Sequence, residues 1–174
     1  MHRAGRSKVQ HAGTPSLTQG FNCCIFAYGQ TGAGKTYSIL GDTQRLATDF
    51  YAKDRGILPR LLADIFACCD NDADRYWIKC SYMEIYNEQI FDLVSPNLMQ
   101  LNCEEKLRQI REDFKKGVFV EGLSEEHATN YQEAMGILMK GIKNRKISTT
   151  SMNAESSRSH TIFTVYIETE FKDG

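Results

Sequence analysis

The chain has 174 residues, of which 41% are hydrophobic and 25% are charged, and its formal net charge is −1. This composition is ordinary for a soluble globular protein, and the length suggests one domain with a real core. The near-neutral charge gives no bias toward nucleic acid or a membrane surface, and no apolar run approaches the roughly 18 residues of a bilayer span.

The start of the chain is polar. Residues 1–19 lack sustained periodicity, and the basic residues Arg3, Arg6 and Lys8 are followed by no apolar stretch of the kind found in a secretory signal. We therefore expect a divergent, disordered N-terminal arm at 1–19 and one folded unit at 20–174. A basic tail that touches an acidic partner is the alternative, although three basic residues support it only weakly.

A glycine-rich stretch then follows an apolar one. Residues 23–28 have the length and composition of a buried strand, and residues 29–36 fit the pattern G-x-x-x-x-G-K-[ST] at every fixed position. Residues 36–40 can begin a helix. A strand, a glycine loop and a helix in this order are the context of a phosphate-binding loop, whereas a glycine-rich turn that matches by accident is the plainer alternative.

Each residue type in this loop has a chemical reason. The glycines allow backbone angles that a Cβ would forbid, so that successive N–H groups can point at a phosphate. Lys35 supplies a positive charge for the β- and γ-phosphates, and Thr36 supplies a hydroxyl for Mg²⁺. The predicted nucleotide-binding residues are Gly29, Gln30, Thr31, Gly32, Ala33, Gly34, Lys35, Thr36 and Tyr37.

The next elements follow from periodicity. We expect a long polar loop at 41–54, and then a helix from Ile57 that has Pro59 in its first turn and ends at the polar cluster 70–72. Residues 75–86 predict a long strand with little polar surface on either side, which is typical of a strand covered by helices on both faces.

The second half of the chain alternates loops and elements. Residues 90–94 predict an extended or helical turn, and a polar loop follows at 95–106. Two short strands, 107–111 and 117–120, have the spacing of a hairpin.

A second long helix is signalled at its start. Asn130 with Glu133 three residues later forms a capping-box pattern, and basic residues between 140 and 146 suit the C-terminal end of the helix dipole. A hydroxyl-rich loop at 148–160 and an alternating strand around 163–167 should follow. We find no internal repeat and no second domain boundary.

The six cysteines do not predict a metal site. None lies in a C-x-x-C pair, and no Cys/His cluster has zinc spacing. Since most lie in apolar runs, they indicate free thiols in a reducing, cytosolic compartment. They are Cys23, Cys24, Cys68, Cys69, Cys80 and Cys103.

The loop before the last strand concentrates polar ligands. A nucleotide-hydrolysing enzyme with a P-loop needs a second element that senses the γ-phosphate, and a serine-rich loop with an arginine could supply it. Alone, such a loop is more often a solvated turn or a phosphorylation target. The candidate catalytic residues are Asn153, Ser156, Ser157 and Arg158.

This stretch resembles the switch I motif N-x-x-S-S-R-S-H of kinesin motor domains. Five motifs resemble that family in order and spacing: the P-loop at 26–36, the stretch 82–88, the stretch 117–123, Asn144-Arg145, and switch I at 153–160. The resemblance implies an α/β fold with a P-loop NTPase-type central sheet flanked by helices, truncated in this chain. It also implies a microtubule motor that hydrolyses ATP with Mg²⁺.

The resemblance also implies residue roles. Lys35 would hold the β- and γ-phosphates, and Thr36 and Ser157 would coordinate Mg²⁺. Ser156 and Asn153 would close the loop over the γ-phosphate and position water. In the same scheme, the Arg158 guanidinium would pair with an acidic residue of switch II.

The implied partner is the microtubule. Residues 107–120 resemble the hairpin that touches tubulin, so Lys115 and Lys116 are candidate contacts, with a solvated charge pair as an equal alternative. The resemblance implies a cytoplasmic, cytoskeletal location and a contact that is weak in this fragment, and it leaves the oligomeric state undefined. No nucleic acid or membrane partner is expected.

The departures from the family predict a fragment. We find no switch II motif of the D-x-A-G-S-E type after the last strand and no R-x-R-P motif before the P-loop. We therefore expect a piece of a motor domain, or the product of a damaged or mispredicted gene, that hydrolyses ATP slowly or not at all. The alternatives are a non-motor remnant that binds nucleotide weakly or only docks to a partner, and an unrelated P-loop kinase or GTPase. That last class would need a base-recognition motif or an arginine-rich lid, and neither is visible.

Overall fold

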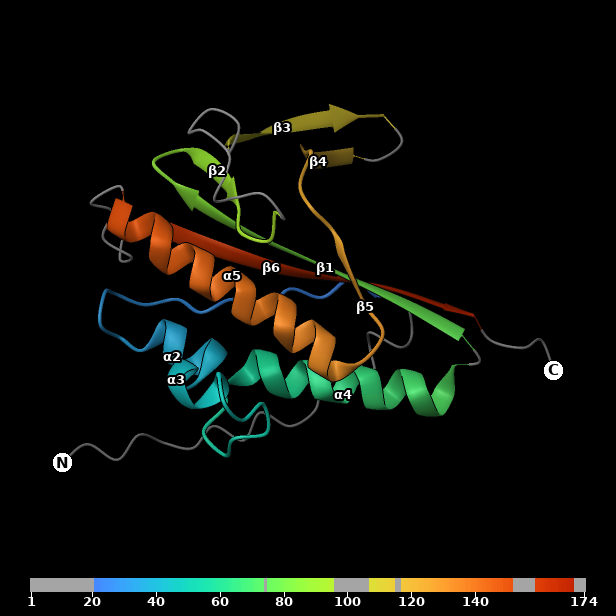
Figure 1. Ribbon diagram of the computed structural model, residues 1–174. Coiled ribbons are helices and arrows are strands. Elements are labelled where there is room, and N and C mark those ends of the chain that lie inside the picture. Colours follow the sequence, from blue (N-terminus) through green and yellow to red (C-terminus); the bar gives the residue numbers. More distant parts are fainter. Residues whose placement is uncertain (1–20, 74, 96–106, 115–116, 152–158, 171–174) are drawn as a thin grey trace.

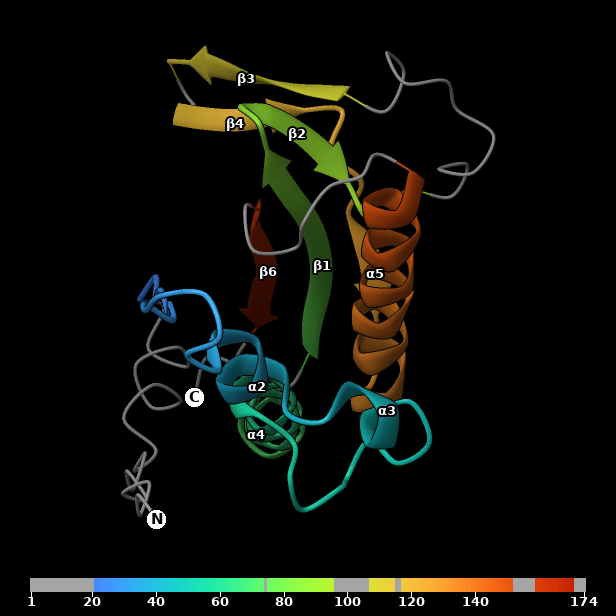
Figure 2. The same cartoon turned by 90° about the vertical axis from the view of Figure 1, so that its left-hand side faces the viewer.

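The computed structural model describes residues 21–170 except 74, 96–106, 115–116 and 152–158. Helices lie beside one sheet, as Figures 1 and 2 show. The elements in chain order are α2 (Lys35–Leu40), α3 (Thr43–Leu46), α4 (Ile57–Asp72), β1 (Arg75–Tyr86), β2 (Gln89–Asp92), β3 (Leu107–Asp113), β4 (Gly117–Glu121), β5 (Glu126–Ala128), α5 (Tyr131–Ser151) and β6 (Ser159–Glu170).

Strand β1 is the centre of the sheet. Along one edge it pairs with β2 through residues 83–86 and with β5 through residues 78–80, and along the other edge it pairs with β6 over its full length. All of the strand pairs in the described residues are antiparallel. The predicted strand at 75–86 is therefore confirmed and carries the rest of the sheet.

Tight turns set the register of the β1–β2 hairpin. Tyr86 pairs with Gln89, so only Asn87 and Glu88 form the turn, with φ of 49° and 61°. Two successive residues with positive φ match the right-handed twist of the paired strands. Residues 89–92 are thus a strand, which decides between the extended and helical alternatives.

The hairpin of β3 and β4 is also confirmed. The two strands pair from Gln109 with Glu121 to Asp113 with Gly117, and β3 joins β2 through Leu107 and Arg108. The hairpin lies at the end of the molecule opposite α2 and α3 in both views (Figures 1 and 2). The predicted loop at 95–106 lies almost wholly outside the described residues.

Helices α4 and α5 pack on one and the same face of β1. The shared core joins Leu62 and Phe66 of α4, Leu138 of α5, and Ile78 and Cys80 of β1. Side chains alternate along a strand, so Trp77 points to the opposite face, where it is 42% exposed. The expectation that helices cover both faces of β1 is wrong for the described residues, because both packed helices lie on the same side.

The two long helices are confirmed, with one boundary corrected. Helix α4 begins at Ile57 and ends at Asp72 as expected, but α5 continues to Ser151. The expected loop therefore begins later than residue 148, and the basic residues between 140 and 146 do not form the last turn. Two of them contact the sheet side of the helix instead: Lys140 donates to the Val94 carbonyl and Arg145 pairs with Glu84, while the neighbouring Asn144 amide donates to the Leu93 carbonyl.

The apolar stretch before the P-loop is not a strand. Residues 21–28 have no regular secondary structure, and Phe26 and Tyr28 are 81% and 96% exposed. A strand requires a neighbour for its backbone hydrogen bonds, and no strand pairing of these residues occurs in the described part of the chain. The predicted buried strand at 23–28 is therefore wrong in this structure.

The polar segment between α2 and α4 is more ordered than expected. It contains the short helix α3, whose first N–H groups are capped by the Asp42 carboxylate. The segment closes on itself where Gly41 and Arg55 form a β-bridge, so α2 and α4 lie close together. None of the helices described is both long and apolar enough to cross a membrane.

Candidate nucleotide-binding site

The backbone of the glycine loop is shaped by its glycines. Gly29, Gly32 and Gly34 have φ of 154°, 82° and 83°. These angles strain any residue with a Cβ, which explains the two glycines that the pattern fixes, Gly29 and Gly34, and also favours glycine at the variable position 32. The loop turns back on itself through a hydrogen bond of 3.1 Å from the Ala33 N–H to the Gln30 carbonyl.

The side chain of Lys35 folds over the start of the loop. Its ammonium group donates to the carbonyls of Gly29 and Gln30 at 2.7 and 2.8 Å. The predicted cation is thus held within the loop rather than extended into solvent. The residues from Gln30 to Gly34 are exposed, so the cradle is open to an incoming anion.

Helix α2 begins at the end of the loop. Its first hydrogen bond joins the Ser38 N–H to the Gly34 carbonyl at 2.8 Å, and Gly34 is its N-terminal cap. Thr36 lies in the first turn and is exposed, and Tyr37 beside it is 59% exposed. The predicted helix at 36–40 is confirmed, and the predicted nucleotide-binding stretch from Gly29 to Tyr37 is contiguous and accessible.

These residues fit a nucleoside triphosphate and Mg²⁺ in their chemistry. Free N–H groups at a loop and helix start favour phosphate oxygens, and a lysine that already satisfies two carbonyl acceptors can donate to a phosphate in the same place. The Thr36 hydroxyl is the kind of oxygen ligand that Mg²⁺ takes.

The predicted γ-phosphate sensor cannot be placed in the same way. Asn153, Ser156, Ser157 and Arg158 lie outside the described residues. The structure describes the two elements on either side of them, α5 up to Ser151 and β6 from Ser159.

A buried polar group beside that segment was missed by sequence reasoning. Glu84 of β1 is only 4% exposed, and Arg145 Nε lies 3.0 Å from its Oε1. The same guanidinium donates to the Ser159 hydroxyl at 2.9 Å. The signal was Glu84 as the one charged residue in the second half of the strand 75–86, which indicates a charge that needs a partner.

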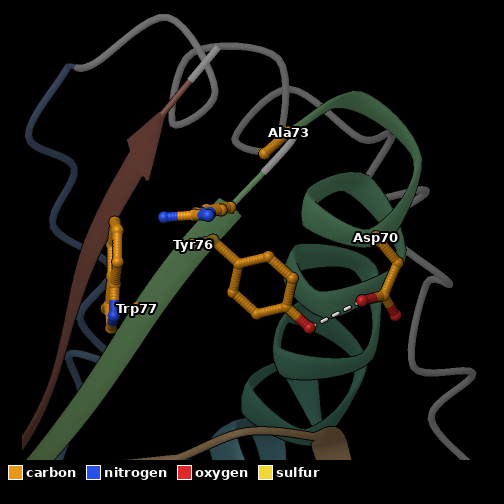
Figure 3. A pocket seen from close by; sticks show the side chains of 5 residues that line it. Asp70, Ala73, Tyr76 and Trp77 are labelled. Atoms are coloured by element: carbon orange, nitrogen blue, oxygen red, sulfur yellow. Dashed lines mark hydrogen bonds between the residues drawn. The ribbon is translucent and has the colours of Figure 1, made fainter. Parts of the chain in front are cut away.

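A shallow depression of about 390 Å³ lies far from the glycine loop. Its lining comes from the end of α4 and the start of β1, where the Tyr76 hydroxyl donates to Asp70 at 2.6 Å (Figure 3). This hydrogen bond, together with burial, raises the pKa of Tyr76 to about 12. Helix α4 separates the depression from α2 by its length, about 24 Å at 1.5 Å per residue. The depression therefore forms no part of the nucleotide site.

The β3–β4 hairpin presents an exposed apolar surface. Ile110, Phe114 and Val118 are 61%, 105% and 72% exposed. The buried carboxylate of Asp92 holds the base of the hairpin, since it accepts from the Ser124 N–H at 2.8 Å and pairs with Arg108 at 3.6 Å. The candidate contacts Lys115 and Lys116 lie outside the described residues.

Comparison with known proteins gives a consistent result. The family model of the kinesin motor domain matches residues 6–174. The chain is 44% identical over 160 residues to kinesin-like protein KIN-12E of Oryza sativa subsp. japonica, which covers 88% of this chain and 8% of that protein. It is 45% identical over 163 residues to kinesin-like protein KIF15 of Strongylocentrotus purpuratus, which covers 90% of this chain and 11% of that protein.

A solved structure agrees with the sequence comparisons. A fast kinesin, described with implications for its ATPase mechanism and its interactions with microtubules, superposes with a TM-score of 0.70 at 39% identity. The match covers 82% of this chain and 37% of that one. The chain spans about a tenth of the length of the two curated relatives described above. With a family model that matches nearly its whole length, the chain belongs to the kinesin motor domain family.

Proposed function

We propose that this chain is the nucleotide-binding part of a microtubule-based motor that hydrolyses ATP. The observation that carries the proposal is the glycine loop, in which Lys35 is held by two loop carbonyls beside glycines of positive φ. A glycine loop of this sequence between an extended segment and a helix is the arrangement with which P-loop proteins hold the phosphates of a nucleotide. Membership in the kinesin family supports ATP as the nucleotide.

Each loop residue has a role in this proposal. Backbone N–H groups between Gly29 and Lys35, other than the Ala33 N–H that bonds to Gln30, bind the phosphates. Lys35 exchanges its two carbonyl acceptors for phosphate oxygens. The hydroxyls of Thr36 and Ser157 would hold Mg²⁺. When bound, Mg²⁺ neutralises charge that develops on the β- and γ-phosphates. Tyr37 completes the binding stretch beside Thr36.

The proposed catalytic residues follow α5. Asn153 and Ser156 orient the attacking water and close over the γ-phosphate, and Arg158 forms an ion pair with an acidic residue of a second switch. A loop that orders around the γ-phosphate changes the affinity of a motor for its track when the phosphate leaves. We accordingly place the protein on the cytoskeleton in the cytoplasm.

Thermal stability tests whether the pocket binds nucleotide. Mg-ATP at about 100 times its Kd should stabilise the native chain by about 2.7 kcal/mol, which corresponds to a rise in Tm of about 5–10 °C. Lys35→Ala should abolish the rise because it removes the one cation in the loop. Lys53→Ala, which removes an exposed lysine outside the loop, should leave the rise intact. A wild-type Tm that stays constant at millimolar Mg-ATP would overturn the proposal.

The β3–β4 hairpin supports the microtubule as the partner. The double variant Lys115→Glu, Lys116→Glu should weaken co-sedimentation with microtubules at least threefold, because the tubulin surface is acidic and the change reverses the charge at the hairpin tip. Lys53→Glu is the matched control. Equal co-sedimentation of both variants would exclude the hairpin as the contact.

The docking-module alternative is less well supported. The family match covers the glycine loop and switch I together, and a chain that only docked to a partner would need neither. The wild-type Tm separates the two, because a chain that only docks would melt at the same temperature with and without Mg-ATP, whereas a nucleotide-binding chain would show a rise that Lys35→Ala abolishes.

A further inference from the structure

Three side chains from three elements meet on the helix-covered face of the sheet. Glu84 comes from β1, Arg145 from α5, and Ser159 from the first position of β6. Arg145 Nε lies 3.0 Å from Glu84 Oε1, and its Nη2 donates to Ser159 Oγ at 2.9 Å. The side chains of Arg145 and Glu84 are 17% and 5% exposed, so the group is largely shielded from water.

The register of the sheet explains why the three residues meet. Glu84 pairs directly with Thr161 of β6, and Ser159 lies two residues earlier on the same face. Arg145 lies six residues before the end of α5, so its guanidinium links the last turns of the helix to the first residue of the strand. The only chain between these ends is the segment 152–158, which holds the proposed catalytic residues.

Two neighbouring contacts hold this part of α5 in place. The Asn144 amide donates to the Leu93 carbonyl at 2.7 Å, and the Lys140 ammonium donates to the Val94 carbonyl at 2.8 Å. Both acceptors follow β2, which is paired to β1. Arg145 therefore extends from a backbone that is itself tied to the sheet, and its direction is well defined.

The chemistry requires arginine at this position. A buried carboxylate without a partner is costly, so Glu84 needs a cation. The planar guanidinium offers donors in a fixed fork and can serve the carboxylate and the hydroxyl at once, whereas a lysine ammonium is a point charge on a flexible stem. The Ser159 hydroxyl accepts a hydrogen bond from Arg145 and therefore contacts a protein side chain.

We infer that Arg145, oriented by Glu84, is a positioning residue that fixes Ser159 and thereby the strand-side end of the segment carrying Asn153, Ser156 and Ser157. In this proposal the Ser159 hydroxyl contacts the protein, whereas Ser156 and Ser157 serve the nucleotide. The inference rests on the proposed function, since it assigns the support for the proposed γ-phosphate sensor. The group acts through Ser159 and touches no nucleotide.

Nucleotide preference tests the inference. Kd values are measured by titration calorimetry on the whole chain for Mg-ADP and for a non-hydrolysable Mg-ATP analogue. Ser159→Ala keeps the Glu84–Arg145 pair and the backbone pairing of Ser159 with Tyr86 but removes the hydroxyl that Arg145 holds. Arg145→Lys keeps the charge beside Glu84 but loses the fork. Each variant should raise the Kd for the Mg-ATP analogue about tenfold, which corresponds to the loss of a charge-assisted hydrogen bond. The Kd for Mg-ADP should stay within about twofold of the wild-type value.

The control and the opposing outcomes are well separated. Thr164→Ala removes a hydroxyl from the same strand on the opposite face and should leave both Kd values unchanged. An equal rise of the two Kd values would show a general structural role and overturn the inference. A ratio of the two Kd values that stays at the wild-type level in both variants would overturn it as well. A wild-type chain that binds neither nucleotide would overturn the proposed function and this inference with it, whereas a wild type with no difference between the two nucleotides would overturn the inference alone.

Discussion

At the start of α5, three polar residues form the helix cap. The Asn130 side chain accepts from the Glu133 N–H at 2.9 Å, while the Glu133 carboxylate accepts from the Thr129 N–H at 2.8 Å and from its hydroxyl at 2.9 Å. The capping box expected from the sequence is therefore present, with the return bond made to Thr129 rather than to Asn130. Such reciprocal bonds satisfy N–H groups that a helix start leaves open.

The cap gives the stability of the chain a pH dependence. The bond from the Thr129 backbone, then that from its hydroxyl, lowers the pKa of Glu133 from its ordinary 4.5. A group whose pKa is lower in the folded state stabilises above its unfolded pKa and loses this effect as the pH falls through the folded value. Glu133→Gln should therefore flatten the loss of stability below about pH 4.5, as measured by Tm between pH 7 and pH 3.

A matched substitution checks this assignment. Glu88→Gln also removes one carboxylate, at an exposed turn outside the cap. It should leave the slope of Tm against pH below 4.5 as it is in the wild type. A slope that Glu88→Gln flattens as much as Glu133→Gln would show that net charge, and not the cap, causes the acid sensitivity.

Among the secondary-structure elements, α5 comes closest to the sheet at a glycine. A Cβ on Gly141 would overlap the ring of Tyr82 on β1. That ring is 3% exposed and stacks edge-on against Phe163 of β6 at 5.4 Å between centroids, so it has no room to move. The helix therefore depends on this glycine for its distance from β1.

Two glycines of the same helix provide a paired test. Gly141→Ala should destabilise the chain by about 2 kcal/mol, because overpacking costs more than the helix propensity that alanine adds. Gly136→Ala should stabilise it by about 1 kcal/mol, because a Cβ there has nothing within 4 Å. Urea unfolding measures both changes. If Gly141→Ala also stabilised the chain, the close approach of α5 to Tyr82 would be wrong.

Considered as a whole, the molecule has one covered and one open face of its sheet. In the described residues, α4 and α5 cover the face that carries Ile78 and Cys80. On the other face, Trp77, Ile162 and Tyr166 are 42%, 41% and 44% exposed on the neighbouring strands β1 and β6. An apolar surface across two adjacent strands is of the kind that promotes self-association.

Self-association should respond to changes on that face. The double variant Ile162→Thr, Tyr166→Thr removes apolar area and places threonine, a β-branched residue that suits a strand, at both positions. It should reduce the associated fraction at least twofold in analytical ultracentrifugation of the isolated chain. Phe114→Thr, at the tip of the hairpin, is the control and should change little. A wild-type chain that is monomeric, or an associated fraction that falls in Phe114→Thr and not in the double variant, would exclude the open face as the cause.

The sequence by itself determined the elements whose signal is local. Glycine spacing and Lys35 defined the phosphate loop, the apolar period from Ile57 defined α4, and Asn130 with Glu133 defined the start of α5. These features depend on residues within one or two turns of each other, so the pattern and the physical cause coincide. The motifs in order also identified the family, which the comparisons confirm.

Only the tertiary structure decided what depends on distant partners. The stretch 23–28 has the composition of a strand, yet it forms none among the described residues, because a strand is made by its neighbour. Strand β5 is three residues long and exists because β1 offers an edge at Ile78–Cys80. The sequence predicted Arg145 to be a charge at the end of a helix. In the fold its side chain lies between Glu84 and Ser159, which are 61 and 14 residues away in sequence. These three features depend on long-range pairing and burial, which a short stretch of sequence does not contain.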